Sequence, residues 1–303
     1  MGSFFGTATD GGRRLRALLD AEDTILAPGA YDALSARLVE AAGFPAVYMT
    51  GFGTVASVLG RPDVGLLTMS EMVEHARQLV GAVDVPVIAD ADTGYGNSIN
   101  VIRTVQEYAQ AGVAALHIED QEMPKKCGHV DTSKRLVPAS EMATKVAAAV
   151  AARGDHDLVV IARTDARSVE GLDAALDRAR RYRDAGADVL FVEAPQCEEE
   201  IEAVASALDG TPLLFNWAEG GKTPAVRLDW LRELGFRIVL YPISTLLAAT
   251  RAVREVLDGI RTTGTPAAAM DRLVPFGEFL DFIGMSEIEG LEARFAEIGP
   301  SPT

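Results

Sequence analysis

The chain has little cysteine, no long apolar run and no excess of positive charge, and each absence excludes a class of protein. Two cysteines in 303 residues are too few for a disulfide framework, so we expect a reducing compartment, the cytoplasm. No apolar run approaches the ~18 residues of a membrane span, and the first residues lack the apolar core of a secretory signal. The net charge of −16 argues against nucleic-acid binding, which needs a basic surface.

Eight short apolar segments alternate with stretches of helical period. The segments are Thr24–Leu26, Ala46–Met49, Val87–Ala89, Ala115–Ile118, Val159–Ala162, Val189–Val192, Leu213–Phe215 and Arg237–Leu240. The clearest amphipathic stretches are Tyr31–Ala42, Ser98–Ala111, Leu172–Ala185 and Leu228–Leu234, and Thr68 with Glu71 forms a capping box that opens another helix. This alternation predicts an α/β fold with a parallel sheet, either a closed barrel or an open doubly wound sheet.

The position of the polar residues favours the barrel. Charged or polar groups follow seven of the eight segments, and in a barrel they meet at the C-terminal rim, where barrel active sites lie. An open sheet would gather them at one switch point. We therefore predict a (β/α)₈ TIM barrel over residues 23–303 as one domain, after an N-terminal extension of residues 1–22. Long loops are expected over Thr50–Leu67 and Glu119–Pro138, and extra C-terminal helices over Arg272–Ile298.

Carboxylates cluster at the expected rim. Asp90 and Asp92 end the third segment, Glu119 ends the fourth, and Asp63 lies on the long connection after the second. Hard oxygen ligands without surrounding cysteine or histidine suit Mg²⁺, with Mn²⁺ as the alternative. The competing interpretation is that Asp90 and Asp92 cap the next helix or pair with arginine, although capping would not require a third carboxylate on the neighbouring strand.

A second motif, Lys125-Lys126-Cys127-Gly128-His129, lies in the long connection after the fourth segment. Neighbouring cations favour thiolate, so we expect a lowered pKa at Cys127 and a reactive thiol. Gly128 gives this connection freedom to fold over a substrate. The alternative is a solvated basic loop with an incidental cysteine.

Several stretches together resemble the isocitrate lyase/phosphoenolpyruvate mutase superfamily. They are Pro28-Gly-Ala-Tyr-Asp-Ala-Leu-Ser-Ala, Tyr48-Met-Thr-Gly-Phe-Gly, Pro62-Asp63, Asp90-Ala-Asp-Thr-Gly-Tyr-Gly-Asn, His117-Ile-Glu-Asp-Gln, Pro124-Lys-Lys-Cys-Gly-His, Ile161-Ala-Arg-Thr-Asp-Ala, Asn216, Glu219-Gly-Gly-Lys-Thr-Pro and Tyr241-Pro. They occur in order from about Leu26 to the last helices. The resemblance implies a barrel whose eighth helix is exchanged between subunits, in a homotetramer built from dimers.

The resemblance also implies roles for individual residues. Asp90 would bind Mg²⁺ directly, with Asp63, Asp92 and Glu119 acting through waters. The substrate-binding residues it implies are Thr50, Gly51 and Phe52 through backbone N–H groups, Asp90, Lys126, Gly128, His129, Arg163, Glu193 and Asn216. The catalytic residues it implies are Cys127 as general acid on a loop that closes as a lid, Tyr48, Arg163, Glu119 and His117.

These residues suit cleavage of a C–C bond in a small anionic 2-hydroxy acid of the 2-alkylmalate or methylisocitrate type. The alternatives are a carboxyphosphonoenolpyruvate phosphonomutase, an oxaloacetate hydrolase or decarboxylase, and a barrel that has lost catalysis. Methylisocitrate lyases generally have Ser-Gly-Gly-Gly where this chain has Thr50-Gly-Phe-Gly. Phe52 therefore favours a smaller or more apolar substrate. Trp217 and Lys222 are further candidates near the site, whereas Cys197, His75 and His156 are assigned no role.

Overall fold

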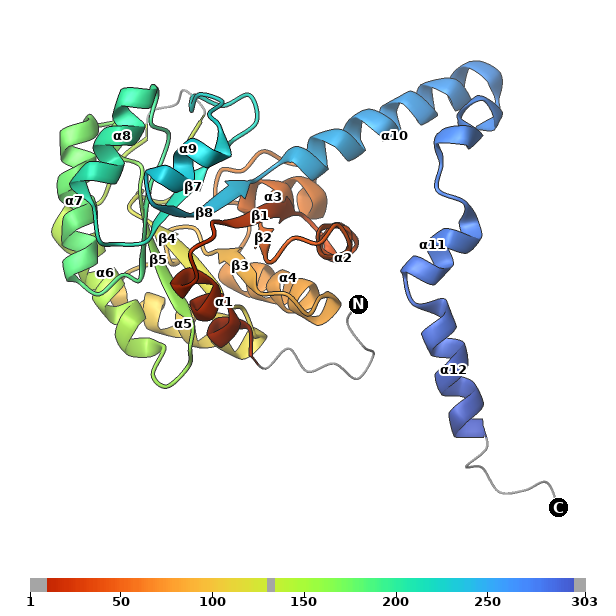
Figure 1. Cartoon of the computed structure of the whole chain (residues 1–303), viewed down its shortest axis with the longest axis horizontal. Coiled ribbons are helices and arrows are strands. Elements are labelled where there is room, and N and C mark those ends of the chain that lie inside the picture. Colours follow the sequence, from red (N-terminus) through yellow and green to blue (C-terminus); the bar gives the residue numbers. More distant parts are fainter. Residues whose placement is uncertain (1–9, 130–133, 297–303) are drawn as a thin grey trace. The chain divides into compact units, whose positions relative to one another are not determined.

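The computed structural model describes residues 10–129 and 134–296, and it contains a closed barrel of eight parallel strands in the order β1 to β8 (Figure 1). The strands are β1 (Ile25–Ala30), β2 (Val47–Met49), β3 (Val87–Asp90), β4 (Ala115–Glu119), β5 (Val159–Thr164), β6 (Val189–Val192), β7 (Leu213–Asn216) and β8 (Phe236–Tyr241). Each lies at one of the predicted segments, so the barrel prediction is confirmed.

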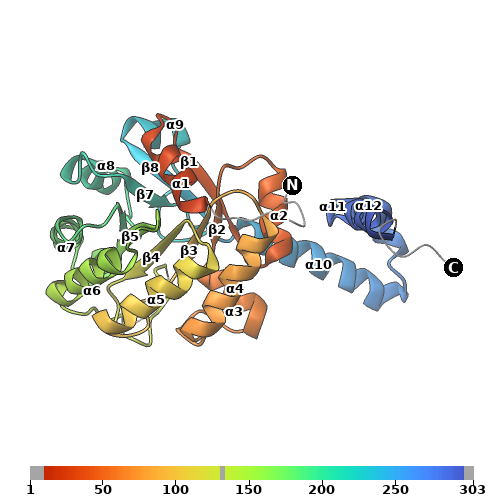
Figure 2. The same cartoon turned by 90° about the horizontal axis from the view of Figure 1, so that it is seen from below.

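Helices surround these strands (Figure 2). They are α1 (Gly11–Asp20), α2 (Ala33–Ala41), α3 (Gly51–Leu59), α4 (Met69–Ala82), α5 (Ser98–Ala111), α6 (Ala139–Ala152), α7 (Leu172–Asp184), α8 (Glu198–Ala207) and α9 (Leu228–Glu233). The capping box of Thr68 and Glu71 opens α4 as predicted. Residues 50–67, predicted as a loop, instead contain α3, so that prediction is wrong over Gly51–Leu59.

The strands divide their side chains between two cores with a period of two. Along β5, Val159 and Ile161 belong to the cluster inside the barrel, whereas Val160 and Ala162 pack against the surrounding helices. Successive side chains of a strand point to opposite faces. Arg163 continues the inward series and therefore reaches the barrel interior at its C-terminal end. Leu15 of α1, within the predicted extension, joins the same interior cluster.

The chain divides into two compact units between Leu247 and Ala248, so the single domain predicted for residues 23–303 stays a prediction. The second unit contains most of α10 (Ser244–Thr263), followed by α11 (Phe276–Phe282) and α12 (Met285–Ala296). These helices agree with the predicted C-terminal helices, whose last residues, up to Ile298, lie outside the described part of the chain. No helix of the described residues is long and apolar enough to cross a membrane.

Candidate active site

The inward periodicity of neighbouring strands gathers the polar residues at one end of the barrel. Asp90 at the end of β3 is paired in register with His117 on β4, and Glu119 on β4 is paired with Arg163 on β5. Asp90, Glu119 and His117 are all under 5% exposed. Burying charges in this way is costly unless they pair with one another or bind something. Strand register alone therefore builds a charged cluster inside the rim.

The acidic half of this cluster surrounds a lysine. Lys125 Nζ lies 2.6 Å from Asp63 Oδ2 and 2.8 Å from Asp92 Oδ1, and its side chain is 3% exposed. Asp90 and Glu119 also act electrostatically on this ammonium, and the pKa of Lys125 is raised well above its usual value because these carboxylates outweigh the effect of burial. Burial raises the pKa of Asp92 to about 6 against the attraction of Lys125. Lys125 thus provides cationic compensation for this acidic cluster.

The donor set fits Mg²⁺. Among the described residues, no three His, Cys, Asp or Glu side chains form a ready-made coordination group, and Lys125 lies between two of the predicted ligands. However, Asp63 Oδ1 is buried without a hydrogen-bond partner. The Asp90 carboxylate is also buried beside Asp92, whose backbone N–H donates to Asp90 Oδ1 at 2.9 Å. Hard, anionic oxygens with unused acceptor capacity are the ligands that Mg²⁺ prefers. Neither Asp90 nor Asp92 caps α5, because its N-cap is Asn97.

The first turn of α3 packs closely against the carboxylate of Asp90. Thr50 is the N-cap, and its Oγ1 accepts from Gly53 N at 3.2 Å. The N–H groups of the first turn have no intrahelical partner and favour anions. A Cβ on Gly51 would lie 2.2 Å from Asp90 Oδ2, so only glycine allows this approach. An anion at these amides would therefore lie next to the acidic cluster.

Arg163 pairs with several carboxylates of the rim. Its Nε donates to Asp165 Oδ2 at 2.8 Å and lies 3.1 Å from Glu119 Oε2, and its Nη1 lies 3.8 Å from Glu193 Oε2. Its guanidinium also lies 5.0 Å from the centre of the Phe191 ring. These carboxylates raise the pKa of Arg163 well above its usual value despite burial. The guanidinium is held in place before any substrate arrives.

Cys127 is a half-buried thiol rather than the reactive thiolate that the sequence suggested. Burial raises its pKa above the ordinary value, an effect that the backbone N–H of His129 only partly offsets. The prediction of a lowered pKa is therefore wrong, because burial outweighs the nearby positive charge of Arg163 and the ammonium of Lys125 is paired with Asp63 and Asp92. A thiol of raised pKa keeps its proton at neutral pH. This suits a proton donor rather than a nucleophile.

His129 joins the cysteine segment to the loop after β7. The backbone N–H of Lys222 donates to His129 Nδ1 at 3.1 Å, so Nε2 carries the proton and faces Glu193 Oε1 at 2.6 Å. Asn216 Nδ2 donates to the same Glu193 carboxylate. His129 and Arg163 lower the pKa of Glu193 strongly, although burial opposes them. Lys222 therefore reaches the site through its backbone.

Tyr48 and His117 form a neutral pair on the floor of the site. Tyr48 Oη lies 3.0 Å from His117 Nε2. Burial lowers the pKa of His117 to about 4, even with Asp90 nearby, and burial raises the pKa of Tyr48 well above its usual value. Both groups are uncharged at neutral pH, and the phenol hydroxyl is available to orient an oxygen of the substrate.

A cavity of about 240 Å³ lies above these groups, and residues distant in sequence line it. The predicted site residues that line this cavity are Tyr48, Thr50, Phe52, Asp63, Asp90, Lys126, Cys127, Gly128, His129, Arg163, Glu193 and Asn216. The predicted residues Gly51, Asp92, Glu119 and His117 lie behind this lining, in contact with Asp90, Lys125, Arg163 and Tyr48 respectively. The sequence thus predicted most of the cavity, although it did not assign site roles to Lys125, Glu219, Pro242 or Ile243.

Part of the cavity lining is apolar. Phe52, Ala218, Pro242 and Ile243, which we call the apolar wall, come from the connections after β2, β7 and β8. Glu219, an acidic side chain beside this wall, accepts from Ile243 N at 3.2 Å. Trp217 instead packs near Tyr241, with ring centres 6.1 Å apart. The cavity lining therefore combines charged groups with apolar side chains.

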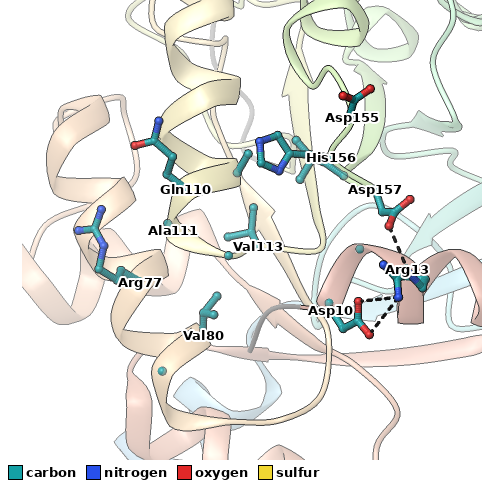
Figure 3. Close-up of a pocket in the computed structure, with 16 residues that line it drawn as sticks. Asp10, Arg13, Arg77, Val80, Gln110, Ala111, Val113, Asp155, His156 and Asp157 are labelled. Carbon is teal, nitrogen blue, oxygen red and sulfur yellow. Dashed lines mark hydrogen bonds and ion pairs between the residues drawn. The ribbon is translucent and has the colours of Figure 1, made fainter. Parts of the chain in front are cut away.

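A second, larger cavity of about 560 Å³ lies at the other end of the barrel (Figure 3). Its polar side chains, among them Arg77 and His156, are exposed, and Arg13 there lies 3.3 Å from Asp10 and 3.5 Å from Asp157. Solvated, paired charges of this kind are ordinary surface. This hollow lacks the buried charges that mark the cavity at the C-terminal rim.

The comparisons with known proteins agree with this geometry. The family model described as phosphoenolpyruvate phosphomutase matches residues 15–261. The chain is 46% identical to 2,3-dimethylmalate lyase of Eubacterium barkeri over 93% of this chain and 97% of that protein. It is 44% identical to 2-methylisocitrate lyase of Aeropyrum pernix over 92% of this chain and 89% of that protein.

The chain belongs to the isocitrate lyase/phosphoenolpyruvate mutase superfamily. Among solved structures, oxaloacetate acetylhydrolase with 3,3-difluorooxalacetate is 36% identical, with a TM-score of 0.89 and all of both chains covered. Phosphonopyruvate hydrolase in complex with oxalate and Mg²⁺ is 34% identical, with a TM-score of 0.86 and coverage of 94% and 99%. The protein is thus an enzyme of a superfamily of lyases, mutases and hydrolases, and the members share a barrel while their substrates differ.

Proposed function

We propose that this enzyme is a Mg²⁺-dependent carbon–carbon lyase that cleaves a 2-alkylmalate to a 2-oxo acid and a second carboxylate. The observation that carries the proposal is that the half-buried, protonated thiol of Cys127 lines the same cavity as Arg163 and the first turn of α3. A proton donor is needed at one end of the breaking bond, and anion-binding groups are needed at the other.

The substrate's 2-oxo-acid half would lie over the acidic cluster. Its carboxylate accepts from the first-turn N–H groups of α3 and from Arg163, and Tyr48 Oη orients its C2 oxygen. Asp90, with Asp63, Asp92 and Glu119 around it, would hold Mg²⁺, which supplies Lewis-acid stabilisation to that half when bound. Because Gly51 has no side chain, the carboxylate site at the first turn of α3 can lie directly beside the acidic cluster.

The reaction would proceed by transfer of the C2 hydroxyl proton to water and cleavage of the C2–C3 bond. The C2 oxygen becomes the carbonyl of the 2-oxo acid, and the electron pair of the broken bond remains on C3, delocalised into its carboxylate. Cys127 then transfers its thiol proton to C3, which leaves as the second carboxylate product. The raised pKa of Cys127 keeps that proton available.

The apolar wall supports an alkyl-substituted substrate over a tricarboxylate. It offers hydrocarbon to a methyl or ethyl substituent, whereas Glu219 beside it would repel an additional carboxylate. Burying a carboxylate there without a cation would be costly. The 46% identity to a 2,3-dimethylmalate lyase supports the same choice.

A substrate panel with separate detection of each product tests the proposal. Purified enzyme with Mg²⁺ is incubated with 2,3-dimethylmalate, methylisocitrate, oxaloacetate and phosphonopyruvate. We expect release of a 2-oxo acid from the alkylmalate, with kcat/KM at least about tenfold above that for the tricarboxylate. Oxalate with acetate would indicate a hydrolase, and a changed P–C signal in phosphorus NMR would indicate a mutase. Either of these as the dominant activity would contradict the lyase assignment.

We further propose a homotetramer of helix-exchanged dimers in the cytoplasm. The apolar faces of the second unit support the assembly, since Phe276 is 76% exposed and Leu257 58% exposed. Monomers rarely leave contiguous apolar surface uncovered. The two cysteines, both free, fit a reducing compartment.

A further inference from the structure

Lys134 is a buried lysine to which the sequence gave no role. Its side chain is 3% exposed, and its ammonium donates to the Gly128 carbonyl at 2.5 Å, Asp165 Oδ1 at 3.2 Å and Ser168 Oγ at 3.3 Å. An ammonium has three N–H donors, so each donor has an acceptor. Burying a charge is costly without such pairing.

Two of these acceptors belong to different parts of the active site. Gly128 directly follows Cys127, whereas Asp165 holds Arg163 through two hydrogen bonds, from Nε at 2.8 Å and from Nη2 at 3.2 Å. Lys134 is therefore the bridge between the backbone beside the thiol and the carboxylate that aligns the guanidinium. Asp165 already has a cation in Arg163, so neutralising Asp165 does not by itself account for a second one.

The backbone at Gly128 lies tightly against the arginine side of the site. A Cβ added to Gly128 would lie 2.5 Å from Glu193 Oε1 and 2.8 Å from Arg163 Nη2. A small displacement of this backbone would move the Cys127 thiol relative to the groups that hold the substrate. Proton transfer depends on such distances.

We infer that Lys134 is a positioning residue, which fixes the Cys127–Gly128 segment against the Arg163–Asp165 pair. It does not touch the substrate. The inference rests on the proposed function only for the role of the Cys127 thiol as proton donor. The placement of the thiol can be measured without any substrate.

Iodoacetamide labelling of Cys127 tests the placement directly. The experiment uses the full chain with Cys197→Ala, so that Cys127 is the single thiol, and follows its alkylation by mass spectrometry. We expect Lys134→Met to raise the alkylation rate at least roughly fivefold, because a released segment exposes the thiol. With an active 2-alkylmalate, kcat should fall roughly 10- to 100-fold while KM changes much less.

Arg135→Gln is the matched control. It removes the same charge from the next position, but Arg135 is 75% exposed and its Nε lies 2.9 Å from Glu122. This variant should label and turn over as the parent does. Lys134→Arg keeps the charge but changes the donor geometry, and it should give an intermediate labelling rate.

Two results would overturn the inference: a folded Lys134→Met variant that labels at the parent rate, or an equal increase in Arg135→Gln. If Lys134→Met does not fold, a Lys134→Arg variant that labels at the parent rate would also overturn the inference. If the parent cleaves no alkylmalate, the proposed function fails while the labelling comparison still decides the role of Lys134.

Discussion

The thiol of Cys127 controls the proposed chemistry at the scale of a single residue. We expect Cys127→Ser to lower kcat by roughly 10²–10⁴-fold, because a hydroxyl is a much weaker acid than a thiol. Binding of oxalate, measured by calorimetry in the presence of Mg²⁺, should persist because its N–H and Arg163 contacts remain. A variant with full activity would remove Cys127 from the mechanism.

The pH dependence of kcat provides an independent test of the same thiol. Burial raises the folded pKa of Cys127 above its ordinary value, so the thiol stays protonated and competent through neutral pH. As pH rises through that pKa, the donor is lost and kcat should fall. Rate measurements across alkaline pH, on enzyme that stays folded, check this expectation. A decline of kcat centred near pH 7 that disappears in Cys127→Ser would contradict a raised pKa of Cys127.

Gly51 tests the contact between the anion site and the acidic cluster. In Gly51→Ala the new Cβ would lie 2.2 Å from Asp90 Oδ2, so the carboxylate must move. We expect kcat/KM to fall at least about tenfold. Gly81→Ala is the control, because a Cβ there meets nothing within 4 Å. Similar losses in both variants would show a general cost of alanine rather than a specific contact.

The chemistry of individual residues was only partly predictable from the sequence. The convergence of strand ends at the C-terminal rim placed Asp90, Glu119 and Arg163 together in the prediction. The protonation of Cys127 was predicted with the wrong sign, since sequence adjacency to Lys125 says nothing about where the ammonium points. Lys134 was missed for the same reason: contacts formed by irregular loops have no period.

At the scale of elements, a buried network attaches α7 to the strands. Tyr182 Oη donates to Asp120 Oδ2 at 2.8 Å, and Thr164 Oγ1 donates to the same oxygen at 2.7 Å. Tyr182→Phe leaves that carboxylate one donor short, which should cost about 1–3 kcal/mol of unfolding free energy. Urea titration measures it. Tyr31→Phe, at a half-buried tyrosine, should cost much less, and an equal loss would contradict the role of the network.

The strands were predictable because each is a short apolar run between turn residues, and α5 was predicted with its observed bounds. Helix α3 was missed because its opening Gly51-Phe-Gly53 is typical of a loop. Its N-cap contact and its packing through Val55 override that local preference. The first turn of α3 is nevertheless where the predicted carboxylate site lies, so the function predicted for this segment depends on the helix that was not predicted.

At the scale of the whole molecule, the proposed assembly would depend on α10. Val253, Leu257 and Ile260 are 56%, 58% and 37% exposed, and spacings of four and three residues place them on one helix face. A second copy of this chain is the partner that the proposed tetramer requires.

We expect the parent to sediment as a tetramer and Leu257→Asp as smaller species, because a buried unpaired carboxylate opposes association. Arg251→Ala, at a side chain that is 85% exposed and off this face, should leave the tetramer intact. A parent that sediments as a monomer at micromolar concentration would contradict the assembly while leaving the barrel's chemistry untouched, because every residue that lines the cavity belongs to the first unit.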